Sequence, residues 1–300
     1  MVSVSLGTRR RDHAAALTLL GTPVDIVRRG FDGDVDAALR AIRELDGRVD
    51  AIGLGGLDVY LHVAGERYVV ADGERLLRAA RITPVVDGSG LKQTLEPAAV
   101  RWLAVHGPVP LRGLPVLMVS AVDRYGMAVA LEEAGCRVVY GDLMFTSGLP
   151  YPISSLAELQ KIARRLVREV TKLPIRMLYP TGQEQERPPE FAFPEEYERA
   201  ALIAGDFHLI RRHVPPRIEG KAVLTNTTTA ADRADLAVRG ARWVFTTTPL
   251  LDGRSFGTNA LEAAVVAVLG RRPEELVPAD FERVLHEISY SPSVVDLEQP

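Results

Sequence analysis

The sequence predicts an α/β fold of two domains with mostly parallel sheets. Strand-like and helix-like apolar patterns alternate along the chain, which is typical of parallel sheets covered by helices. The chain has 300 residues, and at about 150 residues per domain two domains are expected. A strand, a helix and a second strand follow one another between residues 114 and 140, and such a unit favours parallel pairing through a right-handed crossover.

The apolar pattern predicts each element in turn. Strands are expected where short apolar runs end in glycine or a polar residue, at residues 2–6, 24–27, 49–54, 68–70, 84–86, 114–119, 137–140, 201–204, 222–225 and 243–246. Helices are expected where apolar residues recur every three or four positions, at residues 13–20, 34–45, 73–80, 95–105, 125–134, 156–170, 259–269 and 280–289. The polar, proline-rich segment 181–193 is expected to be a surface loop.

The Pro- and Gly-rich segment from His106 to Gly113 is the expected domain boundary. We therefore expect an N-terminal α/β domain at residues 1–107, a second parallel-sheet domain at 108–258, and C-terminal helices at 259–300 that return to pack across the domains. The helix at 259–269 is apolar over much of its circumference, so it is expected to be buried against the first domain or in a homodimer.

Composition excludes several classes of protein. The formal net charge is −3 and the pI about 6.1, which predicts no nucleic-acid partner. A single cysteine, Cys136, excludes a disulfide framework within the chain, and no His-Glu-x-x-His or carboxylate cluster occurs, so no metal is expected. The first residues do not resemble a signal peptide, and the longest apolar run, Ala263 to Leu269, is too short to span a membrane. We expect a cytoplasmic protein without a membrane partner.

The segment Leu114 to Asp142 carries the strongest functional signal. A strand is followed by a tight loop that opens a helix, and a helix N-terminus offers free N–H groups to a pyrophosphate. Ser120 and Val122 occupy the first two glycine positions of the dinucleotide-binding pattern, and Gly126, one residue beyond the third position, is expected to take the role of the third glycine. Asp142 follows Ser120 by 22 residues, close to the spacing of the acid that holds a ribose 2′-OH.

The loop departs from the glycine pattern, and this keeps a second interpretation open. Asp123 would repel a phosphate unless Arg124 offsets its charge. The unit is then either a nucleotide site or a β-α-β unit with only a structural role. If a cofactor binds, Asp142 favours NAD, because a 2′-phosphate would meet a negative charge there; Arg124 and Arg137 leave NADP open.

Hydroxyl-bearing residues follow two later strands. Asn226 and Thr227 come after the strand at 222–225, and Thr247 follows the strand at 243–246. Ligands of open parallel sheets bind beyond the carboxyl ends of the strands, so these three residues are expected at the cofactor. The alternative is that they cap the next helix, as Thr229 is expected to do.

Three segments of the first domain are candidate substrate sites, each at a strand end. Arg9 could clamp a carboxylate with two hydrogen bonds. Gly55 and Gly56 would let a ligand approach the backbone closely, or form a simple turn. The segment Pro84 to Thr94 holds Asp87, Ser89 and Lys92.

Lys92 is one of only four lysines among the 36 basic residues. Unlike arginine, lysine can act as an acid or base near neutral pH. We therefore expect Lys92 with Asp87 to move a proton to and from a substrate hydroxyl, with Ser89 contacting the substrate. The alternative is a surface lysine and an aspartate that caps a turn.

The order of these parts resembles the shikimate/quinate 5-dehydrogenase group. The segments VVDGSGLKQTLEP, VLMVSAVDRYGMAVALEEAGCRVVYGD, VLTNTTT and SFGTNALEA carry the likeness. It implies a Rossmann-like second domain and a lysine of the substrate domain that works with an aspartate. The glycine-rich loop of that family is degraded here, and its Ser-x-Ser motif is matched only loosely by Ser3 and Ser5.

Two main hypotheses follow. The first is an NAD(P)-dependent oxidoreductase that transfers hydride to or from a small polar hydroxy acid similar to quinate or shikimate, with a homodimer left open. The second is a non-redox protein that binds a metabolite or nucleotide on the same fold, which the poor phosphate loop favours. A lyase or transferase is a third reading, because a fold does not fix a function.

Overall fold

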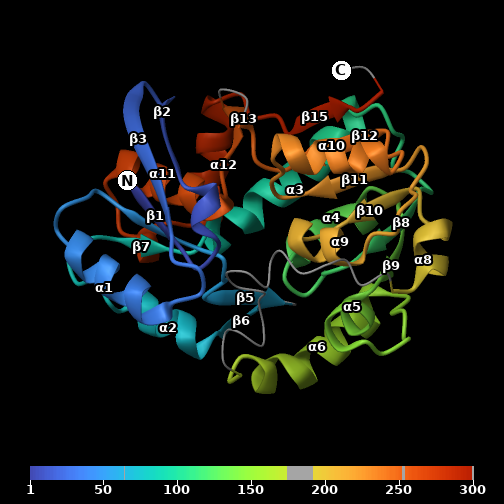
Figure 1. Cartoon of the computed structure of the whole chain (residues 1–300), viewed down its shortest axis with the longest axis horizontal. Helices are drawn as coiled ribbons and strands as arrows, with labels where there is room; N and C mark the ends of the chain where they lie inside the picture. Colours follow the sequence, from blue (N-terminus) through green and yellow to red (C-terminus); the bar gives the residue numbers. More distant parts are fainter. Residues whose placement is uncertain (64, 174–191, 252–253, 299–300) are drawn as a thin grey trace. The chain divides into compact units, whose positions relative to one another are not determined.

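The computed structural model confirms the α/β fold, with two mainly parallel sheets and covering helices (Figure 1). It describes residues 1–63, 65–173, 192–251 and 254–298, so most of the loop expected at 181–193 lies outside the described residues. The chain divides into two compact units. Unit 1 comprises Met1–Thr94, Arg165–Arg187 and Gly257–Tyr290, and unit 2 comprises Leu95–Arg164, Pro188–Phe256 and Ser291–Pro300.

Unit 1 is built on a five-stranded sheet with the order β2-β3-β1-β4-β7. The strands are β1 (Val2–Ser5), β2 (His13–Leu19), β3 (Thr22–Gly30), β4 (Ile52–Gly55) and β7 (Val85–Val86). β1, β3, β4 and β7 are parallel, and β2 pairs with β3 in the antiparallel sense. A separate hairpin joins β5 (Tyr60–Val63) to β6 (Glu66–Val69).

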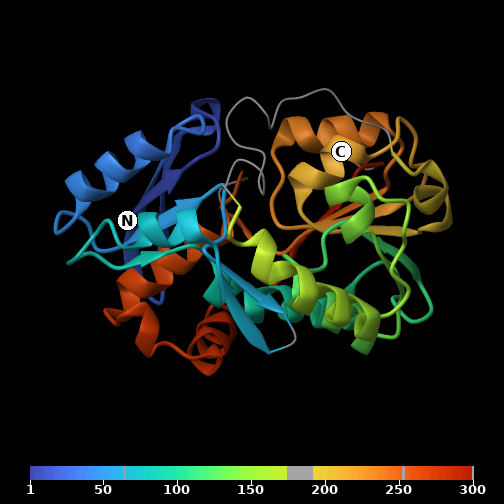
Figure 2. The same cartoon turned by 90° about the horizontal axis from the view of Figure 1, so that it is seen from below.

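Alternate residues of β1 face opposite sides of this sheet. Val2 and Val4 belong to a core that includes Leu39 and Ile42 of α1 (Val35–Leu45). Ser3 faces the other side, where its Oγ accepts a hydrogen bond from Asn259 of α11 (Thr258–Leu269). Figure 2 shows α1 and α11 on opposite sides of the sheet. The period of two along the strand therefore places the two helices on opposite faces.

The segment 13–20, expected to be a helix, forms strand β2 instead. Three consecutive alanines favour a helix by intrinsic propensity. Leu20 and Gly21 both have positive φ, 51° and 75°, and form a two-residue turn that returns the chain as β3. Pairing with β3 along the whole strand outweighs the local preference.

Helix α3 (Ser89–His106) begins six residues before its expected start at residue 95. Its first turn is capped by two carboxylates. Asp87 accepts a hydrogen bond from the backbone N–H of Ser89 at 3.0 Å, and Glu262 of α11 accepts one from Leu91, also at 3.0 Å. The second contact joins residues 171 positions apart, so local sequence could not reveal it.

Unit 2 is built on a six-stranded sheet with the order β15-β12-β11-β10-β8-β9. The strands are β8 (Pro115–Met118), β9 (Arg137–Tyr140), β10 (Leu202–Ala204), β11 (Ala222–Thr225), β12 (Trp243–Thr246) and β15 (Ser293–Asp296). All are parallel to their neighbours except β15, which pairs with β12 in the antiparallel sense. The predicted parallel β-α-β unit at 114–140 is confirmed.

Helices cover both faces of this sheet. One core joins residues of α3, α4 (Tyr125–Glu133) and α6 (Leu156–Val170) to one side of the strands. The other core joins α5 (Asp142–Ser147), α8 (Pro194–Arg199), α9 (Phe207–His213) and α10 (Ala230–Val238) to the opposite side. Thr229 caps α10 in a capping box, as expected.

The remaining elements are short or lie near the chain end. They are η1 (Arg9–Arg11), α2 (Ala71–Leu77), β13 (Leu250–Leu251), β14 (Arg254–Ser255), η3 (Pro273–Glu275) and α12 (Pro278–Glu287). No helix in the described part of the chain has the length and apolar character needed to cross a bilayer.

Candidate functional site

The candidate site lies at the carboxyl ends of the strands of unit 2. β8 has β9 on one side and β10 on the other, and the chain passes from β8 to β9 before it crosses to β10. The carboxyl ends of β8 and β10 thus flank the point where the strand order reverses. Open α/β sheets bind their ligands at this topological switch point.

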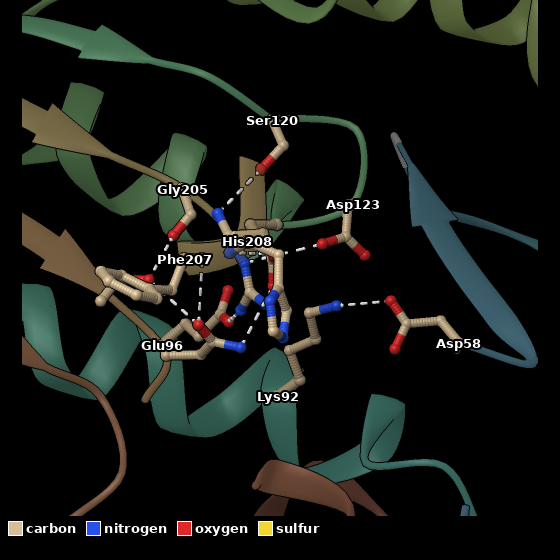
Figure 3. A network of polar contacts seen from close by, with 12 residues as sticks. Asp58, Lys92, Glu96, Ser120, Asp123, Gly205, Phe207 and His208 are labelled. Carbon is tan, nitrogen blue, oxygen red and sulfur yellow. Dashed lines mark hydrogen bonds and ion pairs between the residues drawn. The ribbon is translucent and has the colours of Figure 1, made fainter. Parts of the chain in front are cut away.

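Arg124, in the loop after β8, is the centre of a polar network at this point. Figure 3 labels Glu96, Ser120 and Asp123 of this network. Its Nη2 donates to Oδ2 of Asp206 at 2.8 Å, and its Nη1 donates to Oε1 of Glu96 in α3. A third carboxylate, that of Asp123, lies 3.6 Å from its Nε. Arg124 is 4% exposed and Glu96 1%, so the guanidinium and one of its partners are fixed within the protein.

Asp206 connects the ends of three strands. Its backbone N–H donates to Oγ of Ser120 at 3.0 Å, and this bond joins the carboxyl ends of the neighbouring strands β8 and β10. Its Oδ2 also accepts a hydrogen bond from Nδ2 of Asn226, the residue after β11, at 3.2 Å. Asn226 in turn accepts from the backbone N–H of Phe207 at 3.3 Å. These contacts hold the Asp206 carboxylate in one orientation.

The charges around Asp206 keep it ionised. Burial opposes the charged form, but the positive charges of Arg124 and His208 outweigh it, so the pKa of Asp206 lies below its ordinary value. The side chain of Asp206 is 25% exposed and that of Asp123 is 20% exposed. Two carboxylates are therefore partly accessible, whereas the arginine that orients them is not.

Asp142, expected to hold a ribose, caps the loop instead. Its carboxylate accepts hydrogen bonds from the backbone N–H groups of Ala121 at 2.9 Å and Val122 at 2.8 Å. These are amides of the loop that a pyrophosphate was expected to use. Burial raises the pKa of Asp142 to about 6. In this structure the Asp142 carboxylate accepts the hydrogen bonds of these two loop amides.

The other residues expected at the cofactor have varied positions. Gly126 lies in the first turn of α4, and Thr227 follows Asn226 at the strand end with a partly exposed side chain. Thr247 is fully buried, and its backbone N–H donates to the carbonyl of Thr225 at 2.9 Å. The structure brings Ser120, Asp123, Arg124 and Asn226 together around Asp206.

In unit 1 the expected pair of Lys92 and Asp87 is not formed. Nζ of Lys92 donates to Oδ2 of Asp58 at 2.8 Å (Figure 3). Asp87 accepts hydrogen bonds from the backbone N–H groups of Val59 and Tyr60, at 2.6 and 3.0 Å, and from both the N–H and the hydroxyl of Ser89. Asp87 and Ser89 therefore organise the loops around α3, and Lys92 pairs with Asp58 and not with Asp87.

The glycines of the first domain accommodate a helix instead of a ligand. A Cβ on Gly55 would lie 3.3 Å from Nδ2 of Asn259 in α11, and one on Gly53 would lie 2.6 Å from the backbone oxygen of Asn259. Gly56 forms a turn with φ +77°. Arg9, expected to clamp a carboxylate, makes an exposed ion pair with Asp32 at 3.2 Å, with its side chain 65% exposed.

Sequence reasoning missed three residues of these networks: Asp58, Glu96 and Asp206. Asp206 had a detectable signal, because it follows Gly205 directly after a predicted strand. Glu96 lies four residues after Lys92, and this spacing is meaningful only once α3 is known to begin at Ser89.

Within the described residues, no group of three or more His, Cys, Asp or Glu side chains is arranged to hold a metal ion. Cys136 lies before β9, and its Sγ donates to the carbonyl of Leu111 at 3.3 Å. Burial raises the pKa of Cys136 to about 11, so the thiol is a poor nucleophile.

The fold and this network define an α/β protein with a polar cluster at a sheet switch point. The chain belongs to the family described as Domain of unknown function (DUF8754), whose model matches residues 90–297. Residues 1–87 match a second model, described as Domain of unknown function (DUF8753). A comparison with curated proteins finds no match.

Several solved structures are similar to this chain at low identity. A sugar ABC transport substrate-binding protein from Bordetella parapertussis 12822 is 14% identical, with 100% of this chain and 90% of that chain covered and a TM-score of 0.39. The arabinose-binding component of an ABC transporter from Shewanella sp. ANA-3 is 10% identical, with 100% and 98% covered and a TM-score of 0.34. L-tryptophan dehydrogenase from Nostoc punctiforme is 12% identical, with 88% and 66% covered and a TM-score of 0.36. At these TM-scores the likeness supports no argument about ligand or activity.

These comparisons correct the expected family and activity. The matching family models are the two domains of unknown function, and the similar structures are mostly sugar-binding proteins, not shikimate/quinate dehydrogenases. Because the matching models are those two families, the expected membership of the dehydrogenase group is wrong, and the expected NAD(P)-dependent oxidoreductase, which rested on that resemblance, is corrected with it.

Proposed function

We propose that this chain is a non-redox binding protein for an uncharged, polyhydroxylated small molecule. The supporting observation is the charge balance at the switch point of unit 2. Three carboxylates, those of Glu96, Asp123 and Asp206, surround the single guanidinium of Arg124. The formal sum of these four side chains is −2 (three negative charges and one positive), and −1 when the positive charge of His208 beside Asp206 is included, so the edge of the sheet is rich in hydrogen-bond acceptors.

Acceptors of this kind match a ligand that supplies hydroxyl donors. An ionised carboxylate only accepts hydrogen bonds, and its two oxygens can take two hydroxyls of one ligand. Asp123 and Asp206 are partly exposed and can make such contacts. The buried Arg124 and Glu96 fix the position of Asp206 before the ligand arrives, and this lowers the entropic cost of binding.

The same geometry disfavours a phosphorylated ligand. A phosphate would meet the excess of carboxylates, and the loop amides of Ala121 and Val122 already donate to Asp142. NAD, with NADP left open, stays a prediction from the sequence, and the experiment below tests it directly.

The test is a thermal-shift screen followed by calorimetric titration. The panel contains neutral monosaccharides and polyols, the matching sugar phosphates, and NAD, NADH, NADP and NADPH. A ligand that binds only the folded chain must raise the melting temperature. At a ligand concentration of 100 times its Kd, the free energy of unfolding rises by about 2.7 kcal/mol. We expect a shift with at least one neutral polyhydroxylated compound and none with its phosphate.

Asp206→Asn provides the site variant. Asparagine is also a good N-cap, so the start of α9 is retained while the charge is lost. A hydrogen bond to a charged group contributes about 1.5–3 kcal/mol, so affinity is expected to fall about 10- to 100-fold. The control is Asp235→Asn, which removes an exposed carboxylate of α10 that pairs with Arg239. Binding only by dinucleotides or phosphates, or no binding by any compound, would overturn the proposal.

A further inference from the structure

Strand β2 is an open edge of the unit 1 sheet. It is the terminal strand of the order β2-β3-β1-β4-β7, and within the described part of the chain it pairs only with β3. Its sequence, His13 to Leu19, contains no Lys, Arg, Asp, Glu or Pro. Edge strands are usually protected by such residues, because an unprotected row of N–H and C=O groups pairs readily with another chain.

The hairpin turn determines which backbone groups are available. β2 and β3 are joined by the two-residue turn Leu20–Gly21 and close on the pair Leu19 and Thr22. In a tight antiparallel hairpin the closing pair is hydrogen-bonded, and every second residue from it bonds inward. Ala14, Ala16 and Thr18 therefore direct their N–H and C=O groups outward, and the side chains of all three are exposed.

We propose that β2 pairs with β2 of a second copy of this chain in the antiparallel sense, with the two-fold axis at Ala16. In this register Ala16 faces Ala16 of the other copy, and Ala14 faces Thr18. The outward N–H and C=O groups of the three residues are then satisfied reciprocally, as an isologous interface requires.

The side chains favour a second copy of the same strand as the occupant. In this register Ala15 of one copy lies opposite Leu17 of the other. Both side chains are on the same face of β2 as the buried Leu19, and both are only half-buried in a single copy. Pairing therefore extends the apolar face of the sheet. When a strand pairs with a copy of itself, charged side chains of one sign would lie close together and repel. β2 carries no Lys, Arg, Asp or Glu, so this repulsion does not arise. The apolar helix α11, another candidate for a dimer interface, is already buried within unit 1.

The test measures self-association by sedimentation velocity from low-micromolar to near-millimolar concentration. We expect the wild-type chain to sediment faster as its concentration rises, and we expect its Ala16 and Thr18 amides to gain protection from hydrogen exchange at the same time. The interface is small, so a reversible dimer is expected and not a permanent one.

Ala16→Lys is the main variant. Lys at position 16 faces Asp25 of β3 in its own chain, which does not destabilise the hairpin, but in the dimer it meets a second lysine. We expect the dissociation constant to rise at least about tenfold, equivalent to about 1.4 kcal/mol. Ala16→Pro, which removes an outward N–H without adding charge, is expected to act in the same direction.

Thr22→Lys is the matched control, because it adds the same charge at an exposed position of the hairpin outside the proposed contact. It should associate as the wild type does. A wild-type chain that remains monomeric over the whole range, or Ala16→Lys and Ala16→Pro variants that both associate like wild type, would overturn the proposal. The result is independent of the ligand screen.

Discussion

The buried carboxyl group of Glu262 should make the stability of unit 1 fall as pH rises from 5 to 8. The side chain is 4% exposed and accepts a hydrogen bond from the backbone N–H of Leu91 in the first turn of α3. Burial, and then the negative charge of Asp87, raise the pKa of Glu262 from 4.5 to about 8. The folded chain thus favours the protonated carboxyl group, whereas the unfolded chain ionises it at its ordinary pKa.

The sign and size of the effect follow from this difference. The pKa of Glu262 is about 3.5 higher in the folded chain than in the unfolded chain (8 minus 4.5), and a pKa difference of one corresponds to about 1.4 kcal/mol. The stabilising contribution is fully present below the unfolded pKa of 4.5. As pH rises towards about 8, the unfolded chain binds fewer protons than the folded chain, and about 5 kcal/mol of stability is lost. Glu262→Gln cannot ionise, so this loss is absent in the variant.

The assay is urea unfolding at several pH values between 5 and 8, followed by far-UV circular dichroism. The free energy of unfolding of the wild type should fall across this range, and the Glu262→Gln profile should be flatter. Both tryptophans, Trp102 and Trp243, belong to unit 2, whereas Glu262 belongs to unit 1. Tryptophan fluorescence therefore reports separately on the unit that lacks the substitution.

The control is Glu274→Gln, an exposed glutamate of the same unit, which should keep the wild-type profile. A Glu262→Gln variant with the same pH dependence as wild type would contradict this prediction. A wild-type stability that does not fall between pH 5 and pH 8 would contradict it equally.

Two further predictions concern positions that the folded structure explains. Asp142→Asn should flatten the dependence of the stability of unit 2 on pH between about pH 4 and 6. The raised pKa of Asp142 (about 6 against 3.8) lowers the free energy of unfolding of the wild type by about 3 kcal/mol as pH rises through this range. Tryptophan fluorescence during urea unfolding measures this difference, and an unchanged profile would contradict it. Gly53→Ala should destabilise unit 1 by about 1–3 kcal/mol, because its Cβ would lie 2.6 Å from the backbone oxygen of Asn259; circular dichroism melts measure this loss, and wild-type stability would show that α11 can move away at no cost.

The candidate site could be anticipated only in part. Ser120, Asp123, Arg124 and Asn226 follow strands whose parallel arrangement was predictable, so their presence at one sheet edge was expected. The contacts of these residues were not predictable. The loop amides were expected to donate to a phosphate, whereas in the structure they donate to the carboxylate of Asp142. An acid near the end of β9 has the same sequence spacing whether it faces a ribose or turns back to the loop.

Local apolar patterns are sufficient to predict the alternation of strands and helices and the parallel β-α-β unit from β8 to β9. These features depend on the period of apolar residues, and that period is a local property. Three other features depend on long-range contacts: His13–Leu19 is a strand, α3 begins at Ser89, and Lys92 pairs with Asp58. Each of these features depends on a partner distant in sequence or on a turn that redirects the chain. A carboxylate, an amide or an ammonium group can form hydrogen bonds with many different partners. The fold selects one of them by bringing it within hydrogen-bond distance.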